Sequence, residues 1–202
     1  MPPVERSLSA LDVIYMRRSV RSYTGLVLDR PTVRALIDAA VQAPTAMHEE
    51  PWQFVVIQDA AMLKRCSDRA KASWARQADQ HRDLHEAGEA TARAHFAHQL
   101  TDPEFSLFYN AGTLIVICAK AMGPFVVADC WLAAENLMLA ASAMGLGTCC
   151  IGSAVPALNA PETKAELGIP ADVTAVAPII VGVPDGEASP VPRRDPEIVS
   201  WK

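Results

Sequence analysis

The sequence predicts one folded domain in which helices and strands alternate around a mixed sheet, of either the α/β or the α+β class. Half of the 202 residues are hydrophobic and a fifth are charged, so the chain can bury a sizeable core. Apolar runs of strand type alternate with segments of helical periodicity. The sequence has no glycine-rich phosphate loop after a strand, which leaves both fold classes open.

The beginning of the chain predicts two helices. Residues 7–16 are mostly apolar and are typical of a short helix. Asp29 can cap a second helix, which carries a proline in its first turn and ends at Pro44. The apolar positions of this second helix share one face: Val33, Leu36, Ile37, Ala40 and Val41.

A strand, a third helix and a polar region are expected next. Residues 52–57 (WQFVVI) are β-branched and aromatic, which predicts a strand. A helix is expected to begin at Asp59. The stretch 75–110 has few large apolar side chains and is interpreted as a lid or a variable helical region.

The second half of the chain predicts three strands, two helices and an extended arm. The strands are expected at residues 113–119, 148–151 and 173–183. Pro178 interrupts the last of these, which indicates an edge strand, a bulge or a register break. Helices are expected at 125–144 and 160–167. Prolines recur in residues 184–202, so this segment is predicted to be an extended C-terminal arm.

Composition restricts the compartment and the partners. The formal net charge of -5 argues against a general nucleic-acid surface. An uninterrupted apolar segment of about 18 residues is missing, so neither a membrane span nor a signal peptide is expected. Five cysteines, an odd number without a C-x-x-C pair, favour reduced thiols in a cytoplasmic protein.

Three arginines surround one serine in the segment MRRSVRSY, residues 16–23. Arg17, Ser19 and Arg21 alternate and would face one side of an extended chain. Guanidinium groups pair bidentately with phosphate, and a hydroxyl adds a hydrogen bond. The basic pair at positions 193 and 194 could close the same pocket. The pattern predicts a site for a small anion; the alternative is a set of solvated cations at a helix end.

Four blocks, in this order, resemble the FMN-dependent nitroreductase family: RRSVRSY (17–23), APTAMHEEPWQFVVI (43–57), AAENLMLAASAMGLGTCCIG (133–152) and VGVPDGEASPVPRR (181–194). The resemblance spans residues 8–201. It implies an α+β fold with a mixed central sheet flanked by helices, in an intertwined homodimer with two FMN sites built from both subunits. It also implies ping-pong chemistry, in which NADH or NADPH reduces FMN and a small-molecule acceptor such as a nitroaromatic or a quinone reoxidises it.

The same resemblance, applied position by position, implies the residues that hold FMN. They are Arg17, Arg18, Ser19 and Arg21 at the phosphate and ribityl chain; Pro44, Thr45, Ala46 and His48 in a turn from the partner subunit; Cys150, Ile151 and Gly152 at the ring edge; and Arg193 or Arg194 on the phosphate. Hydride chemistry belongs to the flavin, so no side chain is expected to act as a catalytic acid, base or nucleophile.

The turn departs from the family pattern P-S-x-x-N-x-Q-P-W, because this chain reads PTAMHEEPW. His48 replaces the amide, and Glu50 replaces glutamine. An ionised glutamate only accepts hydrogen bonds, whereas an amide also donates. Both residues are interpreted as making ordinary interface hydrogen bonds.

A histidine cluster provides an alternative hypothesis. His81 and His85 have the i, i+4 spacing of a zinc site, with His95 and His98 nearby, but HRDLH lacks the glutamate of H-E-x-x-H. A polar helix over the active site is the preferred interpretation, and no metal is expected. Two alternatives for the function stay open: a flavin- or metal-binding regulatory protein without turnover, or a family variant with flavin-fragmenting, dehalogenating or azoline-oxidising activity.

Overall fold

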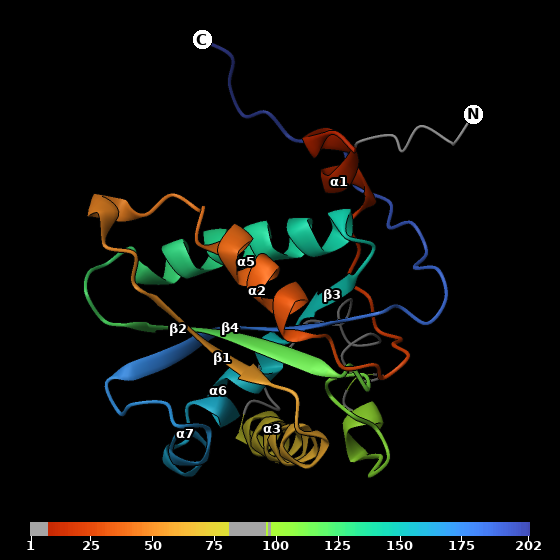
Figure 1. Cartoon of the computed structure of the whole chain (residues 1–202), viewed down its shortest axis with the longest axis vertical. Helices are drawn as coiled ribbons and strands as arrows, with labels where there is room; N and C mark the ends of the chain where they lie inside the picture. Colours follow the sequence, from red (N-terminus) through yellow and green to blue (C-terminus); the bar gives the residue numbers. More distant parts are fainter. Residues whose placement is uncertain (1–7, 81–95, 97) are drawn as a thin grey trace.

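The computed structural model describes residues 8–80, 96 and 98–202, and its centre is a four-stranded sheet between two layers of helices (Figure 1). The strands are β1 (Trp52–Ile57), β2 (Thr113–Lys120), β3 (Gly147–Cys150) and β4 (Val173–Gly182). Their order is β1-β2-β4-β3, and each neighbouring pair is antiparallel. The α+β class is therefore confirmed, whereas the expected mixed sheet is antiparallel in its four described strands, with a parallel isolated bridge between Ser19 and Thr148.

Helices cover both faces of the sheet. One layer contains α2 (Arg30–Ala40) and α5 (Val126–Ala143), and α1 (Ala10–Met16) lies outside this layer against α5. The other layer contains α3 (Ala60–Gln80), α6 (Val155–Leu158) and α7 (Pro161–Leu167). Because both faces are covered, β2 is buried along almost its whole length, which explains its uninterrupted apolar sequence TLIVICA. Alternate residues enter the two cores: Leu114 and Val116 pack with α3, and Ile115 and Ile117 pack with α2 and α5.

Local signals begin and end several helices as expected. The Asp29 side chain accepts a hydrogen bond from the backbone N–H of Thr32 at 2.9 Å, and a proline occupies the first turn of α2. The Ser9 and Asp12 side chains form a capping box at the start of α1. Gly168 ends α7 in the left-handed conformation, with φ of 69°. These predicted helices are confirmed within a few residues of their expected bounds.

The proline of β4 lies in a central strand beside a register break. β4 pairs with β2 on one side and with β3 on the other, so the edge-strand alternative for Pro178 is wrong. Ile117 pairs with Ala177 and Cys118 with Ala175, which leaves Val176 as an extra residue in β4. The Pro178 carbonyl still accepts the N–H of Ile151 at 2.9 Å. The register break is thus the alternative that the structure shows.

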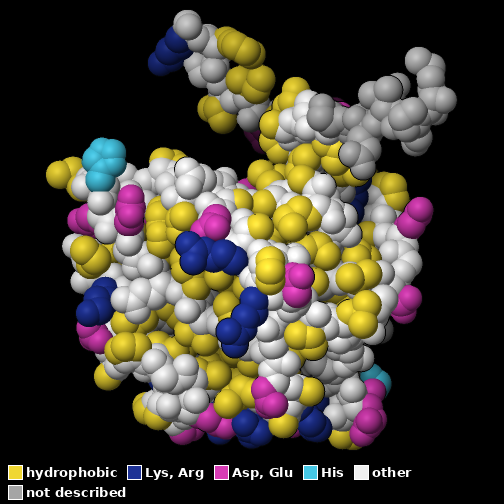
Figure 2. Space-filling model, in the orientation of Figure 1, with side chains coloured by type: hydrophobic (Ala, Val, Ile, Leu, Met, Phe, Trp, Pro, Cys, Tyr) yellow, Lys and Arg dark blue, Asp and Glu magenta, His cyan; other side chains and the backbone are white. Residues whose placement is uncertain are grey.

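Two further 3-10 turns and the chain ends complete the fold. The turns are η1 (Ala46–His48) and η2 (Gly152–Ala154). Residues 75–80 of the expected lid continue α3, whereas 81–95 and 97 lie outside the described residues. Residues 187–202 contain no helix or strand and are exposed. Figure 2 shows hydrophobic side chains on α1 and on the C-terminal segment, both of which extend beyond the rest of the molecule.

One described helix, α5, is long and apolar enough to cross a membrane by composition alone. Its inner side packs against α2 and the sheet, as in the core helix of many folded domains. Its outer side carries exposed Val127, Trp131 and Leu132. Exposed apolar residues in such number are typical of a surface that binds another protein chain.

Candidate functional site

Residues 19–24 are fixed between β3 and the chain that follows β4. Ser19 forms an isolated parallel bridge with Thr148, and the N–H of Val20 donates to the Thr148 carbonyl at 2.9 Å. On the other side, the N–H of Thr24 donates to the Val183 carbonyl at 3.1 Å. Gly147 permits the approach to β3, because a Cβ there would lie 2.8 Å from the Val20 side chain. Backbone hydrogen bonds therefore hold the arginine-rich segment against the sheet.

Residues from near both ends of the chain, 17–22 and 185–193, line a polar cavity of about 590 Å³ in this arrangement. The cluster residues Arg17, Arg18, Ser19 and Arg21 line it, together with Arg193 of the tail. Asp185 and Glu187 also line it, so four arginines face two carboxylates and the lining is net positive. Arg194 is not among the lining residues. The cavity, which we call the arginine cavity, fits a doubly charged anion better than a neutral group.

The arginines of the cavity differ in the partners that they already have. Arg17 Nε lies 3.4 Å from Glu135 Oε1 of α5. Arg18 Nη1 donates to the Arg17 carbonyl at 2.9 Å and to the carbonyl of Tyr15 at 2.5 Å. Within the described part of the chain, Arg21 and Arg193 form no ion pair. These two guanidinium groups are the ones most available to a bound anion.

Arg21 also lies close to the ring of Tyr109, in a smaller cavity next to the arginine cavity. Burial raises the pKa of Tyr109, while the positive charge of Arg21 and a hydrogen bond from it act in the opposite direction. The Tyr109 hydroxyl is therefore neutral near pH 7, and it leaves the positive charge of Arg21 uncompensated.

The segment after β3 presents an open glycine. The N–H of Ile151 donates to β4, and Gly152 is exposed with no atom within 4 Å of the position that a Cβ would take. Burial, and then the neighbouring Cys149, raise the pKa of the Cys150 thiol to about 11, so this thiol is neutral near pH 7. Ser19 pairs with Thr148, and Gly152 follows Thr148 by four residues. Even in a fully extended chain, Gly152 is therefore at most about 14 Å from Thr148. Ile151 and Gly152 do not line the arginine cavity and lie within about 14 Å of Thr148, the residue that pairs with Ser19.

The turn of residues 44–50 lies elsewhere on the molecule. It covers the N-terminal end of α5, where the N–H of Ala46 donates to Asp129 Oδ1 at 3.3 Å (Figure 1). The arginine segment instead contacts α5 at Glu135 and near Ser142, which lie about 9 Å and about 20 Å from Asp129 along the helix. None of the turn residues 44–50 lines the arginine cavity.

The backbone of the turn has an unusual conformation. Met47, His48 and Glu50 have positive φ values of 55°, 56° and 44°. Side chains other than glycine rarely adopt this region, and such residues persist only where the surroundings fix them. His48 and Glu50 are both exposed, so neither is used by the core of this chain.

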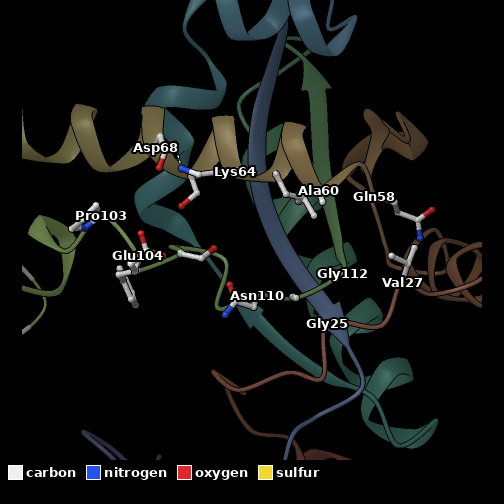
Figure 3. Close-up of a pocket in the computed structure, with 15 residues that line it drawn as sticks. Gly25, Val27, Gln58, Ala60, Lys64, Asp68, Pro103, Glu104, Asn110 and Gly112 are labelled. Carbon is white, nitrogen blue, oxygen red and sulfur yellow. Dashed lines mark hydrogen bonds and ion pairs between the residues drawn. The ribbon is translucent and has the colours of Figure 1, made fainter.

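A second cavity, of about 380 Å³, lies between α3 and residues 103–112 (Figure 3). None of the residues expected to hold FMN lines it. Lys64 Nζ is already paired with Asp68 Oδ2 at 2.7 Å, and the Gln58 side chain donates to the Leu28 carbonyl. The remaining charged residue of the lining is the acidic Glu104, so this cavity has no unpaired cation of the kind that Arg21 provides in the arginine cavity.

The histidine hypothesis falls mostly outside the described residues, since His81, His85 and His95 are not described. His98 is described and exposed. Among the described residues, no group of three or more His, Cys, Asp or Glu side chains could hold a metal ion.

The fold and the arginine cavity define a protein of the α+β class with a cavity lined by four arginines from both ends of the chain. The profile described as Nitroreductase family matches residues 14–183, and the chain therefore belongs to the nitroreductase family.

Three similar proteins illustrate the range of the relationship. A protein of Archaeoglobus fulgidus, provisionally named NADH dehydrogenase/NAD(P)H nitroreductase, is 28% identical over 182 residues, which cover 88% of this chain and 86% of that protein. A 5,6-dimethylbenzimidazole synthase of Rhodospirillum rubrum is 28% identical, with 95% of this chain and 89% of that protein covered. The crystal structure of a nitroreductase with bound FMN from Bacteroides fragilis has a TM-score of 0.75 at 24% identity, with 96% of this chain and 100% of that chain covered.

Several residues that shape the site were not expected from the sequence. Glu135 and Asp129 belong to an apolar helix, Gly147 follows that helix, and Asp185 and Glu187 belong to the proline-rich segment, so the sequence around them indicates no role in a site. Their roles depend on which segments meet in space, and no local pattern around them carries that information.

Proposed function

We propose that this protein is an FMN-dependent oxidoreductase that takes electrons from NADH or NADPH and reduces small electrophiles such as nitroaromatics or quinones. The arginine cavity is the observation that carries the proposal. It holds four guanidinium groups and a serine hydroxyl in a volume within the range of about 300–1,000 Å³ that is typical of cofactor sites. A solved relative with the same fold has FMN bound.

The residues of the chain fit the different parts of FMN. Arg21 and Arg193 would bind the phosphate, with Ser19 as a further hydrogen-bond donor and Glu135 holding Arg17 in place. Ile151 and Gly152 would face the ring, because the open position at Gly152 lets a flat group approach the backbone. Bound FMN would supply the hydride chemistry, while the protein orients it and excludes competing reactions.

We propose further that the site is completed by a second copy of the chain. The turn of residues 44–48 contacts α5 at Asp129 and does not line the arginine cavity of its own chain, whereas the arginine segment contacts α5 at Glu135 and near Ser142. A second copy of the chain would bring this turn to the cofactor. The exposed apolar surfaces of α1, α5 and the C-terminal segment would form the interface, with Trp131 and Trp201 as large contributors. Size-exclusion chromatography with light scattering tests this expectation, and a monomer at micromolar concentration would contradict it.

The decisive experiment is spectroscopic. Purified protein supplied with FMN should show a flavin band near roughly 450 nm that is lost anaerobically on addition of NADH or NADPH. A panel of nitroaromatic and quinone acceptors should then restore the band. Protein that neither retains nor rebinds FMN would refute the proposal, and protein that binds FMN without turnover would favour a regulatory role.

One relative supports a second candidate function. The Rhodospirillum rubrum protein, whose similarity covers nearly the whole of this chain, is named a 5,6-dimethylbenzimidazole synthase. Incubating the protein aerobically with reduced FMN and analysing the products by mass spectrometry separates the two candidates. Formation of 5,6-dimethylbenzimidazole would favour this second function, and unchanged FMN would favour the reductase.

A further inference from the structure

Asp129 is a buried carboxylate whose hydrogen bonds are incomplete. The residue is 3% exposed and lies in the first turn of α5. Its Oδ1 accepts the Ala46 N–H at 3.3 Å, but its Oδ2 is buried and has no hydrogen-bond partner among the described residues. Buried polar atoms without partners are uncommon, and each one calls for an explanation.

The fold of this chain alone does not explain why a carboxylate lies here. Burial of a charged group costs free energy unless its hydrogen bonds are satisfied, and only the start of α5 offers Asp129 a compensating positive potential. An apolar or amide side chain of similar size would avoid the unsatisfied oxygen. A residue that the fold does not need is a candidate for a functional role.

The single partner of Asp129 belongs to the turn whose backbone is strained. Ala46 begins η1, and Met47 and His48 follow it with positive φ. Thr45, at the N-cap position of η1, makes no side-chain capping bond, so the hydrogen bond from Ala46 to Asp129 is the side-chain anchor at this end of the turn. Such a conformation requires external restraint to persist.

We propose that Asp129 is a positioning residue for the FMN site of the partner subunit: it anchors the turn of residues 44–48 in the conformation that contacts the cofactor. This inference rests on the proposed function. Asp129 does not touch the cofactor itself and acts through the Ala46 amide. The unpaired Oδ2 of Asp129 lowers the stability of the fold, and this loss accompanies the placement of a carboxylate under the turn.

Two substitutions and one control test the proposal. Asp129→Ala removes the anchor, whereas Asp129→Asn keeps a carbonyl oxygen for the Ala46 N–H. Thr113→Val is the matched control, because the fully buried Thr113 hydroxyl accepts the N–H of Leu28 at 3.4 Å and the amide of Gln58 at 3.1 Å, away from the turn. For each protein we would measure the FMN dissociation constant by fluorescence, the urea midpoint of the apoprotein, and hydrogen exchange of the Ala46 amide.

We expect Asp129→Ala to weaken FMN binding at least about ten-fold and to speed exchange at Ala46, with a smaller change in urea midpoint than Thr113→Val shows, since removal of the unsatisfied oxygen offsets the loss of the Ala46 hydrogen bond. Asp129→Asn should bind FMN within about three-fold of the wild type. Thr113→Val should lower the urea midpoint without changing FMN affinity.

Three results would overturn the proposal: unchanged FMN affinity in Asp129→Ala, equal losses in Asp129→Asn and Asp129→Ala, or a loss of FMN affinity in Thr113→Val that matches its loss of stability. If Asp129→Ala does not fold, FMN affinity and exchange of the Ala46 amide in Asp129→Asn still test whether Asp129 anchors the turn. A wild-type protein that binds no FMN would refute the proposed function, while exchange at Ala46 would still show whether Asp129 anchors the turn.

Discussion

Arg21 is the residue whose removal should harm FMN binding most clearly. Arg17 is already paired with Glu135, and Arg18 donates to two backbone carbonyls, whereas Arg21 has no ion-pair partner in the described part of the chain. A hydrogen bond to a charged group contributes about 1.5–3 kcal/mol. Substituting Arg21 with Ala should therefore weaken FMN binding by about 10- to 150-fold.

The assay is a fluorescence titration of FMN with apoprotein at low and high salt. Because the arginine cavity opens to solvent, salt should weaken binding to the wild type more than to the Arg21→Ala protein. Arg194→Ala is the control, since Arg194 neighbours Arg193 in sequence but does not line the cavity. Unchanged affinity in Arg21→Ala, or an equal loss in Arg194→Ala, would refute the assignment of the phosphate to this cavity.

Three further predictions follow from named contacts. Glu135→Gln should reduce FMN affinity by less than about five-fold, because its ion pair with Arg17 is half-exposed and such pairs contribute little; a titration measures this. Gly147→Ala should place a methyl group 2.8 Å from the Val20 side chain, lower the free energy of unfolding by about 1–3 kcal/mol and weaken FMN binding, as urea denaturation and titration would show. Burial raises the pKa of Cys150 from 9.0 to about 11, so above pH 9.0 the unfolded chain loses this proton first. Stability should be independent of this group below 9.0 and fall between 9.0 and about 11, and the decline should be shallower in Cys150→Ala.

Sequence reasoning succeeded where local signals dominate. The strand Trp52–Ile57 lies where its β-branched and aromatic run predicted it, and the cap at Asp29 sets the start of α2. It left three alternatives open for Pro178, because the pairing of β4 is non-local and nothing in the sequence around this proline reveals that β4 lies between two other strands. The carbonyl of Pro178 accepts the N–H of Ile151, the residue after β3, so the missing N–H of the proline faces the point where the β3 ladder ends.

In the candidate site, too, local patterns were predictable from the sequence and contacts between distant segments were not. The alternation of Arg17, Ser19 and Arg21 was sufficient to predict an anion site, and the structure brings Arg193 to the same cavity. The sequence did not indicate roles for Asp129 and Glu135, the acidic residues of α5. Their roles depend on which segments cover each side and each end of that helix. Asp129 faces a turn that is far away in sequence, and Glu135 faces the arginine segment.

α5 contacts the turn and the arginine segment at different positions along its length. This separation has a consequence for how two different variants of the chain would behave when they are combined. If the turn and the arginine cavity of one chain serve two different cofactors in a two-fold dimer, a lesion in either feature affects only one of the two sites. A mixed dimer of one Arg21→Ala chain and one Asp129→Ala chain would carry both lesions in one site and none in the other. Two variants that each bind FMN weakly would then complement each other when co-expressed, with one of the two sites restored in every mixed dimer.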